Sequence, residues 1–265
     1  MGSTYKANIF VKEKMDTAEK INNAVDQFEK MGLNLVIGNG QLYSQVFNTI
    51  ANRYSSVHFV TVNGNAIMGN ETNMDIEGYA MGYFGGMTAA KMSSTHRIGA
   101  IGAYEWQPEL KGFFDGAFIQ NPETKVTIVY THSWDNVEKA LKEMDKMIAD
   151  DLDVLYPAGD GYNVEAINKM KEKGLFAIGY ITDQSYLGRN TVLTSTEQHI
   201  DQLYVLAADQ FYRGKLPSGN ISYDFEEGIT SMGQFSPSVP LSFRQQLLKQ
   251  VEIYKKTGVL PVKGL

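Results

Sequence analysis

The sequence contains no cysteine, and this absence removes several kinds of chemistry at once. Without thiols there is no disulfide framework, no thiolate nucleophile and no cysteine-based zinc site. Histidine is also scarce. The four histidines stand far apart and form no H-x-x-x-H or H-E-x-x-H arrangement. We therefore expect neither a metal site nor a bound cofactor.

The sequence also lacks long apolar runs and a surplus of basic residues. No window approaches about 18 consecutive apolar residues, the length that a membrane-spanning helix needs. No apolar stretch of the signal-peptide kind follows Met1-Gly2-Ser3. The formal net charge is -6, and neither a helix-turn-helix pattern nor a basic stripe is present. We therefore expect no direct binding to nucleic acid.

Catalytic motifs are absent as well. No G-x-S-x-G elbow and no G-x-x-x-x-G-K-[ST] phosphate loop occurs, and no nucleophile–base pair can be assembled. Gly38-Asn39-Gly40 resembles half of a dinucleotide fingerprint, but Tyr43 stands at the third glycine position. This segment is either a tight βα turn or a backbone-amide contact to a ligand. An enzyme is the least favoured class of function.

What the sequence has is a regular alternation of strand-like and helix-like segments along its 265 residues. Ala7–Val11 is expected to be the first strand, and Thr17–Met31 an amphipathic helix that ends at Gly32. Apolar runs such as Leu33–Ile37 indicate strands covered on both faces. The spacing of glycines in Gly78–Gly86 predicts close helix packing. The pattern predicts an α/β fold with mainly parallel sheets flanked by helices.

More βα units are predicted than one open sheet comfortably holds, so we expect two lobes. The N-terminal lobe is predicted to hold residues 1–103 and 184–220, and the C-terminal lobe residues 104–183 and 221–265. No linker rich in Pro, Gly or Ser marks the boundary, so short hinges are expected near Ala103 and Asp183.

Polar and aromatic residues follow several of the predicted strands. In a parallel sheet these loops project to one edge, and their side chains suit a planar ligand that forms hydrogen bonds. The alternative is that they are ordinary turns, since Asn-Gly and Asp-Gly are strong turn formers. The loops concerned are Asn63-Gly64, Tyr104-Glu105-Trp106, Ala158 to Tyr162, and Thr182-Asp183-Gln184.

Five segments spread over nearly the whole chain resemble motifs of the basic membrane lipoprotein (BMP, PnrA-like) substrate-binding proteins. They are Asn34 to Gly40, His58 to Gly64, Ile76 to Gly82, Ala177 to Gln184, and Val192 to Ser195. The resemblance implies a two-lobed type I periplasmic-binding fold that closes over a nucleoside-like ligand for ABC-type import. It also implies a lipid-anchored, extracytoplasmic place at the cell membrane.

The sequence departs from the family pattern at three places. The S-F-N motif of the family's first strand and helix is absent, so the first βα unit is expected to be missing from this chain. Either the natural protein has an additional N-terminal βα unit, or another segment or chain fills that slot. Ile181 replaces the aspartate that the family uses on ribose hydroxyls. Thr196-Glu197-Gln198 replaces V-V-K, so the family's lysine is lost.

This pattern is similar to the Med-like branch of the family, whose members are described as positive regulators of competence. Two classes of function therefore stay open. The protein is either a small-molecule receptor for sensing or uptake, or a regulatory protein that acts indirectly through protein contacts with a degenerate cleft. An ABC permease or a regulatory protein is the expected partner, and oligomeric state is undetermined.

Seven residues are predicted to line the ligand site. Asn39 and Asn63 would offer amide hydrogen bonds, and Trp106 would stack on the ligand. Gly159 would allow close backbone approach, and Asp183 would accept hydrogen bonds or hold a hinge. The full set is Asn39, Asn63, Trp106, Gly159, Asp160, Asp183 and Gln184.

Overall fold

The computed structural model describes residues 8 to 265 and divides the chain into two compact units. The first unit comprises Met1–Ile76 and His199–Tyr223, and the second comprises Glu77–Gln198 and Asp224–Leu265. The chain therefore crosses between the units after Ile76, after Gln198 and after Tyr223. Each unit is an α/β body built on a largely parallel sheet, as the sequence predicts.

The first unit is a four-stranded parallel sheet in the order β1-β2-β3-β9. The helix α2 begins at Thr17, whose side chain accepts a hydrogen bond from the Lys20 N–H, and it buries Ile21 and Val25. Its elements are α2 (Ala18–Lys30), β1 (Leu35–Asn39), α3 (Gln41–Ile50), the short turn η1 (Ala51–Arg53), β2 (His58–Val62), β3 (Glu71–Ile76), α8 (Ile200–Tyr212) and β9 (Gly219–Tyr223).

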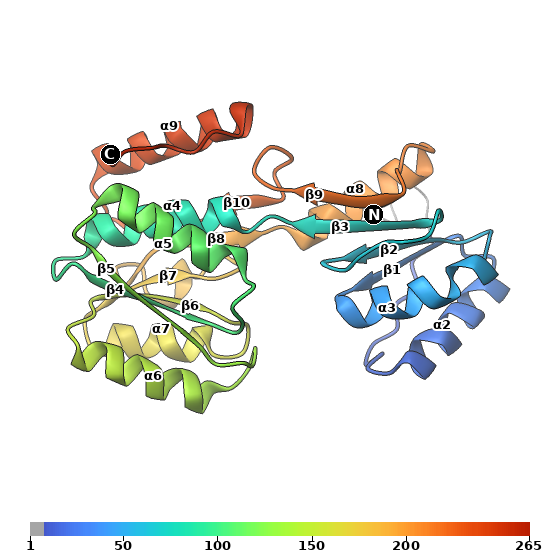
Figure 1. Ribbon diagram of the computed structural model, residues 1–265, viewed down its shortest axis with the longest axis horizontal. Helices are drawn as coiled ribbons and strands as arrows, with labels where there is room; N and C mark the ends of the chain where they lie inside the picture. The colour runs from blue at the N-terminus through green and yellow to red at the C-terminus, as the bar shows by residue number, and fades with distance from the viewer. Residues whose placement is uncertain (1–7) are drawn as a thin grey trace. The chain divides into compact units, whose positions relative to one another are not determined.

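The second unit is a six-stranded sheet in the order β10-β8-β7-β6-β4-β5, in which β10 alone is antiparallel. Helices α4 and α5 cover one face of this sheet and α6 and α7 the other (Figure 1). Its elements are α4 (Tyr79–Met92), β4 (Arg97–Gly102), α5 (Pro108–Gln120), β5 (Lys125–Tyr130), α6 (Val137–Ala149), β6 (Val154–Ala158), α7 (Asn163–Glu172), β7 (Phe176–Gly179), η2 (Ser185–Leu187), β8 (Val192–Gln198), β10 (Thr230–Met232) and α9 (Leu241–Thr257).

Glycines bring α4 and α5 into backbone contact, as the spacing in Gly78–Gly86 predicts. A Cβ atom added to Gly86 would lie 2.0 Å from the Phe113 carbonyl oxygen, and one added to Gly116 would lie 1.9 Å from the Tyr83 carbonyl oxygen. Among the described residues, no helix combines the length and the apolar character needed to cross a bilayer.

Two expectations about boundaries differ from the structure. The prediction of a strand at Ala7–Val11 is wrong for the residues that the structure describes, because residues 8–11 form no strand. Ile9, Phe10 and Val11 are exposed, since no described strand pairs with them. Ala7 lies outside the described residues. The units also do not divide at Ala103 and Asp183. The segment from Glu77 to Ala103 belongs to the second unit, because α4 packs on α5 and against β8.

Strand β1 lies at the end of its sheet and pairs only with β2. A groove of about 810 Å³ runs along its open side. Apolar side chains of α2 and α8 line this groove, including Val25, Phe28 and Phe211. The expectation that another segment or chain fills a strand slot in this lobe stays a prediction, and this groove is the place to look for it.

Candidate functional site

The carboxyl ends of β4, β5, β6 and β7 lie at one edge of the second unit's sheet, because these strands are mutually parallel. In the ladder, Gly102 pairs with both Tyr130 and Ala158. The loops that follow these three residues therefore start side by side. They carry most of the aromatic and acidic residues that the sequence predicts for the site.

Three aromatic residues on these loops form a group that we call the aromatic cluster: Tyr104, Trp106 and Trp134, of which Trp106 is exposed and the other two are partly buried. The Tyr104 and Trp106 rings are stacked, with centroids 5.6 Å apart and planes at 9°. Trp134 meets both rings edge-on at 5.7 and 5.8 Å. Trp106 is 68% exposed, so an aromatic face is open to a ligand.

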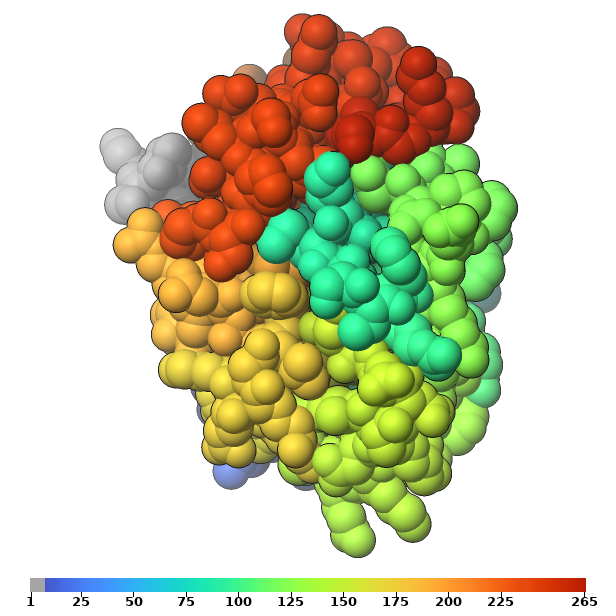
Figure 2. Space-filling model, turned by 90° about the vertical axis from the view of Figure 1, so that its left-hand side faces the viewer, coloured from blue at the N-terminus to red at the C-terminus, as the bar shows by residue number. Residues whose placement is uncertain are grey.

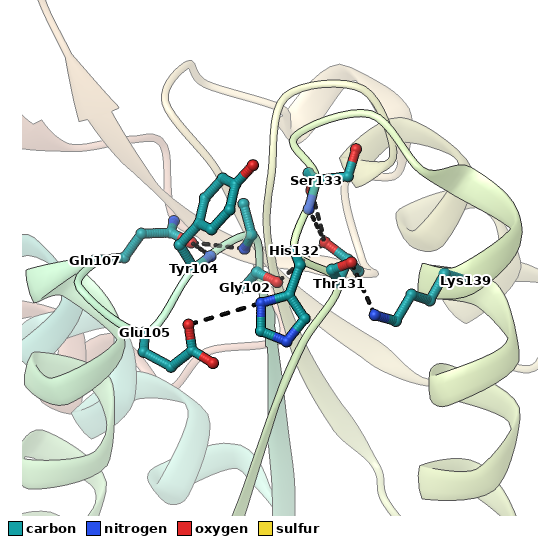
Figure 3. Close-up of polar contacts among 9 residues, drawn as sticks. Gly102, Tyr104, Glu105, Gln107, Thr131, His132, Ser133 and Lys139 are labelled. Carbon is teal, nitrogen blue, oxygen red and sulfur yellow. Dashed lines mark hydrogen bonds and ion pairs between the residues drawn. The ribbon is translucent and has the colours of Figure 1, made fainter. Parts of the chain in front are cut away.

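Hydrogen bonds hold the two loops that carry the cluster (Figure 3). The Gln107 Oε1 atom accepts from the backbone N–H groups of Ala103 at 2.6 Å and Tyr104 at 2.9 Å. On the neighbouring loop, the Lys139 ammonium donates to the Thr131 carbonyl oxygen at 2.9 Å. His132 Nδ1 lies 3.8 Å from a Glu105 carboxylate oxygen, which links the two loops. The aromatic cluster is therefore positioned rather than loose.

Beneath the cluster lies a buried polar network around Glu109, which is 4% exposed. The Glu109 Oε1 atom accepts from Gln107 Nε2 at 2.9 Å and from the Tyr180 hydroxyl at 3.0 Å. Gln107 Nε2 also donates to the Ala158 carbonyl oxygen at 3.0 Å. The network thus joins the ends of β4, β6 and β7.

Burial raises the pKa of the Glu109 carboxyl, and the nearby Asp160 carboxylate adds to the shift. The pKa of Asp160 is itself raised, because its carboxyl is partly buried. Glu109 and Gln107 are not among the residues predicted from the sequence. The pattern that could have indicated them is Trp106-Gln107-Pro108-Glu109, where two polar side chains flank a proline that begins a helix just after a strand.

The remaining predicted residues of the second unit have internal partners. A Cβ atom on Gly159 would lie 2.1 Å from the Tyr162 ring, so packing of that buried ring requires this glycine. Asp183 Oδ1 accepts from the Ser185 N–H at 3.0 Å. Gln184 is 3% exposed, and its Oε1 accepts from the Tyr180 N–H at 2.9 Å. Gln184 therefore orders the end of β7.

Asn39 and Asn63 end β1 and β2 of the first unit's sheet. The Asn39 side chain lies beside the Tyr204 hydroxyl. Asn63 Oδ1 accepts from the Ile76 N–H at 3.0 Å, so the amide oxygen that was expected to meet a ligand is used within the unit. Asn63 has a φ of 53°, a left-handed conformation that asparagine tolerates.

In the Gly38-Asn39-Gly40 segment, Gly38 and Asn39 are the last residues of β1, and Gly40 is the N-cap of α3. A Cβ atom on Gly38 would lie 2.5 Å from the Tyr43 ring, and Gly40 has a φ of 100° at the start of α3. Both glycines are explained by local packing and backbone conformation.

Ile181 has a φ of 68°, which is strained for a β-branched side chain. Its carbonyl oxygen accepts from the Gln198 N–H at 2.8 Å. Two of the places at which the sequence departs from the family pattern therefore bond to each other through their backbones.

Two α/β units joined by three chain crossings have the architecture of two-lobed solute-binding proteins. The profile of the PnrA-like ABC transporter substrate-binding proteins (Bmp) matches residues 1–263. The chain belongs to this family, which confirms the resemblance seen in the sequence. The family is one of substrate-binding, transport-associated proteins.

Individual relatives fall into two groups. The transcriptional activator protein med of Bacillus subtilis is 47% identical over 98% of this chain and 82% of its own length. The nucleoside-binding protein BmpA of Lactococcus lactis is 27% identical over 77% of this chain and 65% of its own length. The crystal structure of a transcriptional activator of the comK gene from Bacillus halodurans superposes with a TM-score of 0.95, at 44% identity over 98% of this chain and 92% of that one.

Proposed function

We propose that this protein is a small-molecule receptor that binds a planar, hydrogen-bonding molecule of the purine nucleoside kind and controls a regulatory output. The observation that carries the proposal is the aromatic cluster at one edge of the second unit's sheet, where the N–H of Gly161, next to Asp160, donates to the Trp134 carbonyl oxygen at 2.9 Å. Trp106 stacks on the planar part of the ligand, and Asp160 accepts from ligand hydroxyl or amino groups. Glu109, Gln107 and Tyr180 are positioning residues that hold the strand ends in place.

Relatives support both halves of this proposal. The nucleoside-binding protein BmpA of Lactococcus lactis is a relative at 27% identity. A purine-binding protein of Brucella abortus is a relative at 24% identity. The relative with 47% identity is a transcriptional activator. Because the chain has a net charge of -6, its effect on transcription is indirect, through an ABC permease or a regulatory protein. We place it outside the cytoplasm, held at the cell membrane by a lipid anchor.

A second candidate is a regulatory protein that has lost its ligand. In its favour, Asn63 and Gln184 use their side-chain oxygens within their own units, and Ile181 offers no polar group at the family's ribose position. The two candidates differ in whether any small molecule stabilises the folded chain.

A thermal-shift titration with purines and purine nucleosides separates the two candidates. A ligand that binds only the folded state stabilises it by about 2.7 kcal/mol at 100 times its Kd, which raises the melting temperature in a saturable way. Trp106→Ala is expected to weaken binding by about ten-fold or more through the loss of stacking. Phe118→Ala, which removes an exposed ring from α5, is the matched control and is expected to bind normally.

The absence of any saturable shift with the unaltered chain would contradict the receptor and favour the second candidate. A shift that Trp106→Ala leaves unchanged would remove Trp106 from the site.

A further inference from the structure

A pocket of about 320 Å³ opens at the edge of the second unit's sheet opposite to the aromatic cluster. It forms where the segment before β8 meets the loop that leads into α9. In Figure 2 these are the golden segment and the orange-red segment beside it, both facing the viewer. The lining residues are Arg189, Gln234, Phe235, Pro237, Leu241, Arg244, Gln245 and Leu248.

The only charged residues of this pocket are two arginines, in a chain whose net charge is -6. Among residues 8–265, no carboxylate lies within 4.0 Å of either guanidinium group. The Nε atom of Arg244 is buried and has no hydrogen-bond partner. A buried donor without a partner costs free energy, so an anion bound at this guanidinium group would be favoured.

The start of α9 adds to the positive character of the pocket. Its N-cap is Pro240, no side chain caps its first turn, and that turn contains no acidic residue. The free N–H groups and the helix dipole therefore favour an anion beside Leu241 and Arg244.

The rest of the lining is apolar. Leu241 and Leu248 are 60% and 45% exposed, and they lie two turns apart on α9 on either side of Arg244. Phe235 and Pro237 supply the opposite wall. A ligand that matches this lining has an anionic head and an apolar body.

We propose that this pocket binds a small amphipathic organic anion, a carboxylate or phosphate monoester, held by Arg189 and Arg244. Guanidinium groups form paired hydrogen bonds with either head group. The volume is at the lower end of the range for small-molecule sites, about 300–1,000 Å³. The site is independent of the receptor function proposed above, because it uses other residues at the opposite edge of the sheet.

The test is calorimetric titration of the full chain with octyl phosphate below its micelle concentration, with uncharged octyl glucoside as the control ligand. We expect saturable binding of octyl phosphate that weakens as salt is added. Arg189→Gln and Arg244→Gln are each expected to bind about ten-fold or more weakly. Lys249→Gln, which removes an equal charge from α9 outside the pocket, is expected to bind like the unaltered chain.

The melting temperatures separate ligand binding from a structural role. If Arg244 serves a ligand, Arg244→Met removes an unpartnered buried donor, and its melting temperature is unchanged or higher. A clearly lower melting temperature for Arg244→Met would assign the residue to folding and overturn the proposal.

The proposal is also overturned by the absence of saturable octyl phosphate binding, by equal binding of octyl glucoside, or by arginine variants that bind like Lys249→Gln. Co-sedimentation with phosphatidylglycerol vesicles in the absence of octyl phosphate binding would assign the arginines to a membrane surface instead.

Discussion

At the scale of single residues, Trp106 and Glu109 show how one short segment serves two purposes. Large aromatic side chains are seldom left mostly exposed on a soluble surface, and Trp106 is 68% exposed while stacked on Tyr104. Three residues later, Glu109 is buried and fixes the strand ends below. An exposed aromatic ring and a buried carboxyl that joins strand ends therefore lie next to each other in the chain.

The raised pKa of Glu109 predicts a pH dependence of stability. The folded state keeps a proton that the unfolded chain releases above the ordinary pKa of 4.5. The contribution of Glu109 to the free energy of unfolding is therefore fully present below this value and is lost as pH rises toward the folded-state pKa, by at most about 1.4 kcal/mol per pH unit. Glu109→Gln should flatten this slope in urea denaturation across that pH window.

The exposed Glu172→Gln on α7 is the control for this measurement, and its slope should match that of the unaltered chain. An equal slope in Glu109→Gln would show that Glu109 ionises as freely in the folded state as in the unfolded chain.

At the scale of elements, the contact between α4 and α5 determines which unit α4 belongs to. Adjacent glycines of α4 face different surroundings. A Cβ atom on Gly86 would lie 2.0 Å from a backbone oxygen of α5, whereas one on Gly85 would lie 3.5 Å from the Ile178 side chain. This difference allows the helix contact to be tested with two neighbouring substitutions.

Gly86→Ala is expected to destabilise the fold by at least about 1–3 kcal/mol, because backbone atoms cannot move aside as a side chain can. Gly85→Ala is expected to be neutral or stabilising by up to about 1 kcal/mol, since alanine favours the helix. Chemical denaturation of both variants measures the difference. Equal stabilities would contradict the close backbone contact of α4 with α5.

The edge strand β1 raises a second question at this scale. Among residues 8–265, no strand pairs with its outer side, and the groove beside it is lined by apolar side chains of α2 and α8. Open edges favour pairing with another chain or segment, so the prediction that a strand occupies this slot is consistent with the groove.

At the scale of the whole molecule, three crossings join the two units, at Ile76, Gln198 and Tyr223. Short connections of this kind are the places where hinge motions occur in two-lobed binding proteins. A ligand that contacts both units would favour a closed state over an open one.

Lobe closure predicts that a ligand identified by thermal shift lowers the radius of gyration measured by small-angle X-ray scattering. Trp106→Ala at the same ligand concentration should keep the larger radius. A saturating ligand that leaves the radius unchanged would show that binding is confined to one unit, and would contradict closure without contradicting the receptor.

Much of this architecture could be read from the sequence. The alternation of apolar strands with helices such as Thr17–Met31 predicts the parallel sheets. A strand that is buried on both faces is a continuous apolar run, and this pattern is visible within the strand's own sequence. The packing role of Gly86 and the exposed position of Trp106 after β4 follow from the same local patterns. The expected strand at Ala7–Val11 fails, since a strand needs a partner that local propensity cannot supply.

The sequence by itself determined the fold class and the family, because these depend on periodicity and on short motifs. Only the tertiary structure decided that Gln184, Gly159 and Asn63 are bound within their own units, and that Glu109 and Gln107 join three strand ends. It also brought Arg189 and Arg244 together from segments 55 positions apart. These outcomes depend on contacts between residues that are distant in the chain, and no local pattern records such contacts.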